Sequence, residues 1–263
     1  MTTRLGIVAD LPAFVVATAG LPLSAYQAVD ASDAIVVVDG ATAWWSAAAR
    51  AAAAGAAAVL VSAPRDVPID AVRDLVARCS TPIIVHRPDL RQDIVEAAED
   101  HRDGVRPRIA VVECRAAPDA LPTMVRDAVG WVRVLANSRL EVAAVAMGRA
   151  GGTALLSRRD GGAAGSVIIA VTRPEGAIFR LQALGETTTE LEIDGAAGRS
   201  ELTTSTSGGR RVAPQAFEAG ERLAIRRAIE VVRHGRPSSD LDDLLHDATT
   251  AAAIIDQAGF PTL

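Results

Sequence analysis

The chain contains no lysine, because all 27 of its basic residues are arginine. Any mechanism that needs a lysine amine, such as Schiff-base formation or proton donation by lysine, is therefore excluded. Aromatic residues make up only 3% of the 263 residues, so the core must be built mainly from Ala, Val, Leu and Ile. Such small side chains suit helices that pack closely on a sheet.

Other features that are missing exclude whole classes of partner. The net charge is −5 with no basic field, which excludes a nucleic-acid binder. No uninterrupted apolar run is long enough to span a membrane. Cys79 and Cys114 are far apart in or beside apolar segments, which favours free thiols in a reducing cytosol and a cytoplasmic location. Nothing is spaced as a metal site, so we expect no metal.

The N-terminus has an alternative interpretation as an export signal. Arg4 precedes an apolar stretch, and residues 23–25 resemble a small-residue cleavage site. Asp10 and Pro12 interrupt that stretch, however, and residues 5–8 fit a buried strand better. We therefore favour the strand.

Residues 1–87 alternate between apolar strands and helical segments. Strands are expected at 4–9, 33–39, 57–62 and 81–86, and helices at 42–54 and 68–79. This alternation with short links predicts a parallel sheet covered by helices, which is a truncated Rossmann-like α/β domain.

Residues 88–263 have a different pattern and are expected to form a second, α+β domain with an open antiparallel sheet. Helices are expected at 89–99, 121–135, 217–234 and 239–258, and strands at 108–114, 141–147, 153–157, 166–172, 177–184 and 188–193. The Ser/Thr/Gly-rich segment 203–209 is interpreted as a loop. Because an apolar outer sheet face needs cover, we expect a homo-oligomer or a hetero-oligomer with an active paralogue.

Three stretches resemble the glucose–fructose oxidoreductase and inositol dehydrogenase family (Gfo/Idh/MocA). The first is residues 33–64, DAIVVVDGATAWWSAAARAAAAGAAAVLVSAP, and the second is residues 127–137, DAVGWVRVLAN. The third is residues 217–237, FEAGERLAIRRAIEVVRHGRP, together with residues 240–255, and it is similar to the last helices of the family. The resemblance implies a two-domain dehydrogenase fold, and its order and spacing cover most of the chain.

The sequence departs from that family where the family's chemistry lies. The first strand runs into residues 9–14, ADLPAF, which contain no glycine and place Asp10 where the family has its phosphate-binding turn. The next strand at Asp33 comes too soon for the usual helix, the ribose-binding strand and the helix that follows it, so much of the dinucleotide half-site is expected to be deleted. According to the resemblance, Ala63 occupies the position where the family has a lysine near the cofactor and substrate, and Asp127 occupies the position of the family's proton-transferring histidine.

These departures predict a degenerate, shortened family member that binds no nicotinamide cofactor. We expect a non-catalytic structural, regulatory or partner subunit. The alternatives are a divergent oxidoreductase or other enzyme that acts on a sugar or polyol, and a small-molecule binding protein that uses the remnant cleft.

Any surviving pocket should lie at the carboxyl ends of the parallel strands. The candidate lining residues are Ser62, His86, Arg87 and Asp127. Asp127 is the one candidate catalytic group, as a carboxylate base in place of the family histidine. Arg87 would bind an anionic or polyhydroxylated ligand, although capping of a loop by His86 and pairing of Arg87 with Asp127 or a neighbour remain open.

Overall fold

The computed structural model describes residues 3–258 apart from 103, 149, 159–163, 173–177 and 196. The chain divides into two compact units, Met1–Arg91 with Phe217–Leu245 and Gln92–Ala216 with His246–Leu263. The expected fold class is confirmed, because a parallel Rossmann-like sheet is followed by a mostly antiparallel sheet. The first unit includes the helix that begins at Gly220, whereas the boundary expected at residue 87 stays a prediction.

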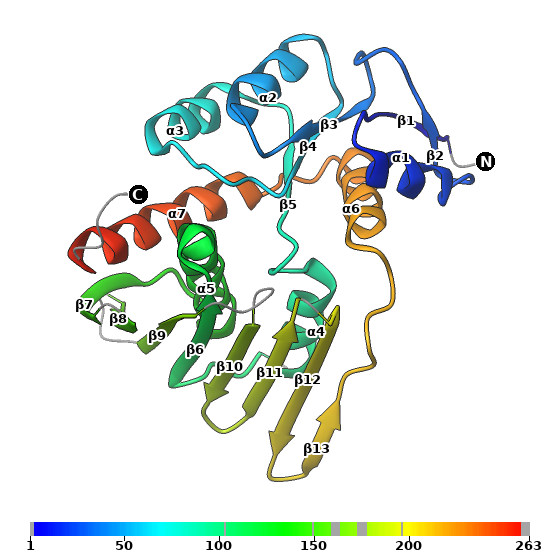
Figure 1. Ribbon diagram of the computed structural model, residues 1–263. Coiled ribbons are helices and arrows are strands. Elements are labelled where there is room, and N and C mark those ends of the chain that lie inside the picture. The colour runs from blue at the N-terminus through cyan, green and yellow to red at the C-terminus, as the bar shows by residue number, and fades with distance from the viewer. Residues whose placement is uncertain are drawn as a thin grey trace. The chain divides into compact units, whose positions relative to one another are not determined.

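The first unit is a five-stranded parallel sheet with helices on both faces (Figure 1). The strand order is β2-β1-β3-β4-β5, and every pair in it is parallel. The elements are β1 (Leu5–Val8), α1 (Pro12–Ala19), β2 (Ala25–Gln27), β3 (Ile35–Asp39), α2 (Trp44–Ala53), β4 (Ala58–Ser62), α3 (Ile69–Arg78), β5 (Ile83–His86), α6 (Gly220–His234) and the start of α7 (Asp240–Ala258).

Each face of this sheet has its own apolar core. On one face, Phe14 of α1 and Ile225 of α6 pack on Ile35, Leu60 and Ile84 of the central strands. On the other face lie Trp44 of α2, Leu75 of α3 and Leu244 of α7. Alternate strand residues serve alternate faces, which explains the unbroken apolar runs of β3, β4 and β5.

The first half of this unit is more complete than the sequence predicted. Helix α1 follows β1 directly, and β2 pairs in parallel with β1, so the expected loss of both elements is wrong. Helix α1 lacks an amphipathic pattern, and β2 has three residues of which only Ala25 is buried. Neither element therefore carries the periodic signal that identifies longer ones. Residues 28–34 link β2 to β3 without a helix, so the expected loss of the helix after the ribose-binding strand is confirmed.

The second unit is an eight-stranded sheet in the order β13-β12-β11-β10-β6-β9-β8-β7. Neighbours are antiparallel except β6 and β9, which are parallel. Its elements are α4 (Gln92–Arg102), β6 (Ile109–Ala116), a 3₁₀ turn (Pro118–Ala120), α5 (Leu121–Ala136), β7 (Glu141–Gly148), β8 (Gly151–Ser157), β9 (Ala164–Val171), β10 (Ile178–Leu184), β11 (Thr188–Asp194), β12 (Arg199–Thr206) and β13 (Gly209–Val212).

The loop predicted at 203–209 is wrong, because this segment forms the end of β12 and its hairpin to β13. Thr206 and Gly209 are register partners across the turn, and Gly209 has φ +141°, a conformation that favours glycine. The β-branched threonines fit a strand, and they were outweighed by the turn-like composition of the segment.

Helix α5 covers the inner face of this sheet and is almost wholly buried. Its C-terminal carbonyls on Val134 and Leu135 accept from the buried guanidinium of Arg102, and Asn137 ends the helix with φ +47°. Arg133 binds both carboxylate oxygens of Asp247 at 2.9 and 3.1 Å, which ties α5 to the later turns of α7. Within the part of the chain that the structure describes, no helix is both long enough and apolar enough to cross a membrane.

Candidate active site

The order of the parallel strands marks one edge of the first unit as the place for a ligand. Strand β1 lies between β2 and β3, so the connections leave in opposite directions at the carboxyl ends of β1 and β3. Open α/β sheets bind ligands in the crevice at such a switch point. The candidate site therefore starts at the turns after Val8 and Asp39.

The turn after β1 presents the N-terminus of α1. Leu11 precedes the helix in an extended conformation without a side-chain cap, and Pro12 is its first residue. The side chain of Gln27 donates to the carbonyl of Ala9 at 3.0 Å, which joins the carboxyl ends of β1 and β2. Asp10 is exposed in this turn.

The turn after β1 suits one part of a dinucleotide better than the other. The helix end offers a partial positive charge to phosphate. Asp30, which follows β2, holds an exposed carboxylate oriented by the backbone N–H of Ser32 at 3.0 Å, and an acid placed about twenty residues after the first turn binds ribose hydroxyls in such folds. The turn has no glycine, and Asp10 adds a negative charge. The adenosine side of a dinucleotide thus fits, whereas its pyrophosphate lacks the usual close backbone cradle.

The turns after β3, β4 and β5 are hydrogen-bonded to one another. The N–H of Gly40 donates to the Ser62 carbonyl at 2.8 Å, and the N–H of Ala63 donates to the His86 carbonyl at 2.8 Å. A Cβ on Gly40 would lie 2.2 Å from the Ser62 oxygen, so this position requires glycine. The carboxyl edge is consequently rigid.

Ala63 has φ +45°, which is unfavourable for a residue with a Cβ. It lies at the position that the family resemblance assigns to the lysine. Strained backbone of this kind persists where the surrounding structure enforces it, and it is concentrated at active sites. The strain therefore marks the end of β4 as part of the candidate site.

Three polar side chains form a row across the ends of these strands. Asp39 is the register partner of Ser62, and Ser62 is the register partner of His86. All three continue the face that packs against α1 and α6, since Ile35, Leu60 and Ile84 precede them at even spacing. The sequence analysis missed Asp39, although a polar residue that ends each apolar run is a signal that identifies the whole row.

His86 is enclosed by both helices of this face. Its ring meets Phe14 edge-on, with centroids 5.8 Å apart and an interplanar angle of 83°. An ideal Cβ on Gly220 would lie 2.9 Å from Nε2, and its three nearest atoms all belong to the His86 ring. Gly220 thus packs directly against Nε2, and a side chain at this position would clash with the ring.

The environment of His86 favours the neutral imidazole. Burial lowers its pKa below 6.5, and Arg91 lowers it further, while Glu221 opposes the shift. Nδ1 is buried, and among the described residues it has no hydrogen-bond partner. Unsatisfied buried groups are rare in folded proteins and often belong to functional sites.

The two remaining predicted site residues, Arg87 and Asp127, are both buried and both have partners. Arg87 is 6% exposed and interacts with other residues. Asp127 belongs to α5 in the second unit, is 1% exposed, and accepts from Arg126 Nε at 3.1 Å. The structure therefore brings Ser62 and His86 together in register, and it places Asp127 in a buried ion pair with its chain neighbour.

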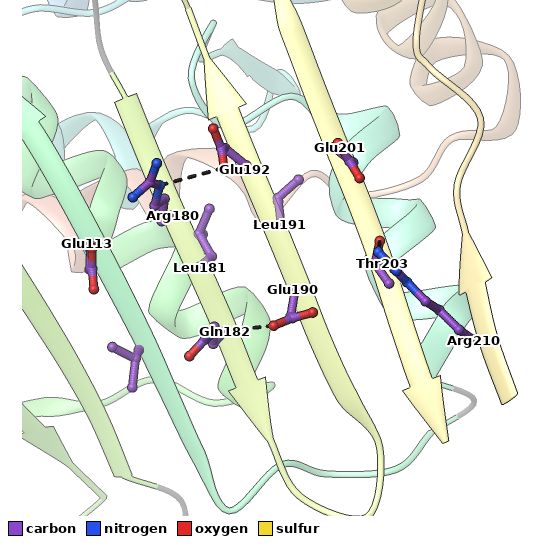
Figure 2. Close-up of a pocket in the computed structure, with 11 residues that line it drawn as sticks. Glu113, Arg180, Leu181, Gln182, Glu190, Leu191, Glu192, Glu201, Thr203 and Arg210 are labelled. Carbon is purple, nitrogen blue, oxygen red and sulfur yellow. Dashed lines mark hydrogen bonds and ion pairs between the residues drawn. The ribbon is translucent and has the colours of Figure 1, made fainter. Parts of the chain in front are cut away.

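The outer face of the eight-stranded sheet has a separate hollow of about 360 Å³. Figure 2 shows its charged lining, in which Arg180 lies beside Glu192 at 3.6 Å and Gln182 donates to Glu190. The expected apolar outer face is thus wrong for β10 to β12, whose outward residues alternate with buried ones and are mostly charged or polar. Exposed apolar side chains on this face include Leu155 of β8, Ile168 of β9 and Leu184 at the end of β10.

Comparison with solved structures identifies proteins that share this fold. No family model matches the sequence, and no curated protein matches it. The chain is similar to UDP-N-acetylglucosamine 3-dehydrogenase GnnA from Acidithiobacillus ferrooxidans, with TM-score 0.70, 14% identity and 98% of each chain covered. It is also similar to aldose-aldose oxidoreductase from Caulobacter crescentus, with TM-score 0.71, 15% identity and coverage of 97% of this chain and 98% of that one.

A third similar structure is KijD10, a 3-ketoreductase from Actinomadura kijaniata in complex with NADP, with TM-score 0.64, 15% identity and 98% of each chain covered. These likenesses over nearly the full length of oxidoreductases contradict two expectations, namely a non-catalytic subunit and the absence of a nicotinamide cofactor. Both rested on missing motif side chains, which do not by themselves remove the fold that holds a dinucleotide. The chain has the two-domain fold of Gfo/Idh-type oxidoreductases.

Proposed function

We propose that this protein is an oxidoreductase of the Gfo/Idh/MocA type that uses a nicotinamide dinucleotide to interconvert a hydroxyl and a carbonyl group on a sugar or polyol. The observation that carries the proposal is the row of Asp39, Ser62 and His86 at the carboxyl edge of a sheet with a β1/β3 switch point. The similar solved structures support the reaction class.

The dinucleotide, when bound, supplies the hydride acceptor or donor. The residues that would hold it are the N-terminus of α1, for the pyrophosphate, and Asp30, for the hydroxyls of the adenosine ribose. Because the turn after β1 contains Asp10 and no glycine, more of the binding free energy must come from the ribose and from contacts away from the phosphates.

His86 is the group that we assign to proton transfer. When a hydroxyl carbon is oxidised, its hydroxyl proton must pass to a base, and the neutral imidazole of His86 accepts it at Nε2. The lowered pKa keeps His86 neutral at pH 7, and it makes the protonated ring a ready acid for the reverse reaction. Ser62 and Asp39 can hydrogen-bond neighbouring hydroxyls, as a polyhydroxylated substrate requires.

A turnover screen tests this assignment directly. The purified chain is incubated with NAD⁺ or NADP⁺ and with a panel of free sugars, nucleotide sugars, polyols and sugar acids, and the reduced cofactor is followed by absorbance. We expect at least one sugar or polyol to give enzyme-dependent reduction that is abolished in His86→Ala. Turnover that His86→Ala leaves unchanged would refute the role of His86, and no turnover with any member of the panel would count against the reaction class.

A further inference from the structure

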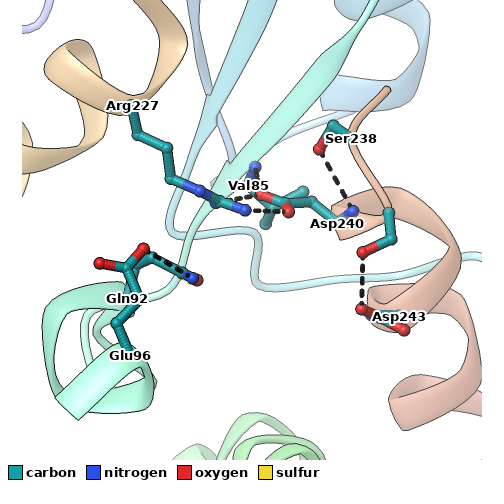
Figure 3. A network of polar contacts seen from close by, with 8 residues as sticks. Val85, Gln92, Glu96, Arg227, Ser238, Asp240 and Asp243 are labelled. Carbon is teal, nitrogen blue, oxygen red and sulfur yellow. Dashed lines mark hydrogen bonds and ion pairs between the residues drawn. The ribbon is translucent and has the colours of Figure 1, made fainter. Parts of the chain in front are cut away.

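Strand β5 lies at the edge of the parallel sheet, so the backbone groups on its outer side have no strand to pair with. The N–H of Val85 points to this outer side and donates to Oδ2 of Asp240 at 2.9 Å. Figure 3 shows this carboxylate reaching from the first residue of α7 to the strand. A charged acceptor thus satisfies the last outward N–H before His86.

Arg227 of α6 fixes the carboxylate of Asp240. Its two terminal nitrogens each lie 2.5 Å from one oxygen of Asp240, in the paired arrangement that gives the strongest arginine–carboxylate contacts. Ser238 Oγ accepts the backbone N–H of Asp240 at 3.3 Å. The side chain of Asp240 is 9% exposed and that of Arg227 is 25% exposed, so water screens this pair only in part.

Helix α6 touches the end of β5 at two places. Arg227 reaches Val85 through Asp240, and Gly220, seven residues earlier on the same helix, lies against Nε2 of His86. Seven residues are about two helical turns, or roughly 10 Å of rigid helix. A fixed distance along α6 therefore sets where His86 lies relative to the helix end.

We propose that Asp240, held by Arg227, is a positioning residue for His86. It anchors the backbone directly before His86 to α6, and this keeps the imidazole packed between Phe14 and Gly220. The inference rests on the proposed function, because it matters for catalysis only if His86 transfers the proton. The charged groups that act on the ring are Glu221 of α6 and Arg91, and Asp240 acts on it through the backbone.

The test compares Asp240→Ala and Asp240→Asn with Asp242→Asn, a matched control. Asp242 is an exposed acid in the same first turn of α7, so its loss has the same effect on the helix dipole. Two quantities are measured by nuclear magnetic resonance in the full-length protein without ligand. One is the hydrogen-exchange rate of the Val85 amide. The other is the set of chemical shifts of the His86 ring protons, which the ring of Phe14 displaces and which are assigned from the signals that disappear in His86→Gln.

Asp240→Ala should speed exchange of the Val85 amide by about tenfold or more, because a hydrogen bond to a charged acceptor is lost. The His86 ring signals should move towards those of a free histidine, and kcat should fall while KM for the dinucleotide stays within about twofold. Asp240→Asn keeps an acceptor for Val85 and should restore most of both signals. Asp242→Asn should change neither.

The proposal is overturned if Asp240→Ala exchanges faster at Val85 and yet keeps wild-type His86 ring signals. If Asp240→Ala does not fold, the same comparison is made with Arg227→Gln, which releases the Asp240 carboxylate, and faster exchange at Val85 with unchanged ring signals again overturns the proposal. Since the ring signals are measured without substrate, an inactive wild-type protein whose His86 signals respond to Asp240 refutes the proposed function and leaves the positioning role standing.

Discussion

Ser62 and His86 lie opposite each other in register, one as the last residue of β4 and the other as the last residue of β5. Two chain segments that are separated by a whole helix thereby present adjacent polar side chains at the edge where parallel sheets bind ligands. The proposed chemistry depends on this pairing, and its consequences can be measured one residue at a time.

Replacing His86 should remove proton transfer and leave cofactor binding intact. Loss of a general acid–base group lowers the rate by about 10² to 10⁴-fold, so kcat for His86→Ala is expected to fall in that range. His234→Ala is the control, because His234 is exposed on α6 and binds only the backbone of its own helix. The measurement is kcat in steady-state kinetics with a substrate from the screen. An equal decrease of kcat in His86→Ala and His234→Ala would contradict the assignment of His86 to proton transfer.

The buried pair of Arg126 and Asp127 makes a different prediction for Asp127. Both side chains are at most 5% exposed, and removing one member of a buried ion pair costs about 3 kcal/mol or more. Asp127→Ala should therefore lower the free energy of unfolding by that amount in urea titrations. Asp74→Asn, which breaks an exposed pair with Arg78, should cost less than about 1 kcal/mol. Equal stability of the two variants would contradict the structural role of the buried pair.

The free energy of unfolding should decrease as the pH is lowered, because His86 then takes up a proton more readily in the unfolded chain. Its pKa in the folded protein is lowered, chiefly by burial, so the unfolded chain binds the proton more readily. Stability is then fully present above about pH 6.5 and is lost as the pH falls towards the lower pKa of the folded state. The free energy of unfolding measured between about pH 8 and about pH 5 should therefore decline less in His86→Gln than in the wild type. A steeper decline in His86→Gln would reverse the sign and contradict the burial of His86.

Elements of the fold could be predicted from the sequence where their hydrophobic pattern was long and regular. The apolar runs of β3, β4 and β5 identified the parallel sheet, and the alternation in β10 and β11 identified the second sheet. Strand β2 was missed because three residues with one buried side chain carry no period, and the hairpin of β12 and β13 was hidden by its Ser, Thr and Gly content.

The candidate site was predicted in part for a similar reason. Ser62 and His86 end apolar strands, so their place at the carboxyl edge followed from the topology. The contacts of His86 with Phe14 and Gly220, and the link from Val85 to Asp240, join segments that are 72 to 155 residues apart for the three pairs. No local pattern encodes such contacts, because they arise only when the helices pack.

We propose self-association through the outer face of the eight-stranded sheet. This face carries Leu155 and Ile168, which are 50% and 36% exposed, beside a charged hollow in which Arg180 is flanked by carboxylates. Light scattering should give a mass above that of the monomer, and the charge reversal Arg180→Glu should weaken assembly, most strongly at low salt. Arg50→Glu, on the exposed side of α2, should leave the mass unchanged. A monomer at every concentration and salt level would contradict this surface assignment.

Calorimetric titration of the purified chain with NADH and with NADPH tests most directly the central claim that this protein binds a nicotinamide dinucleotide. The account predicts saturable binding of NADH and weaker binding of NADPH, because the carboxylate of Asp30 accepts hydrogen bonds from ribose hydroxyls and repels a 2′-phosphate. Asp30→Ser should bring the two affinities closer by about tenfold, whereas Asp33→Asn, a nearby exposed acid, should change neither. Failure of both cofactors to saturate at millimolar concentration would contradict the proposal that this chain is a nicotinamide-dependent oxidoreductase.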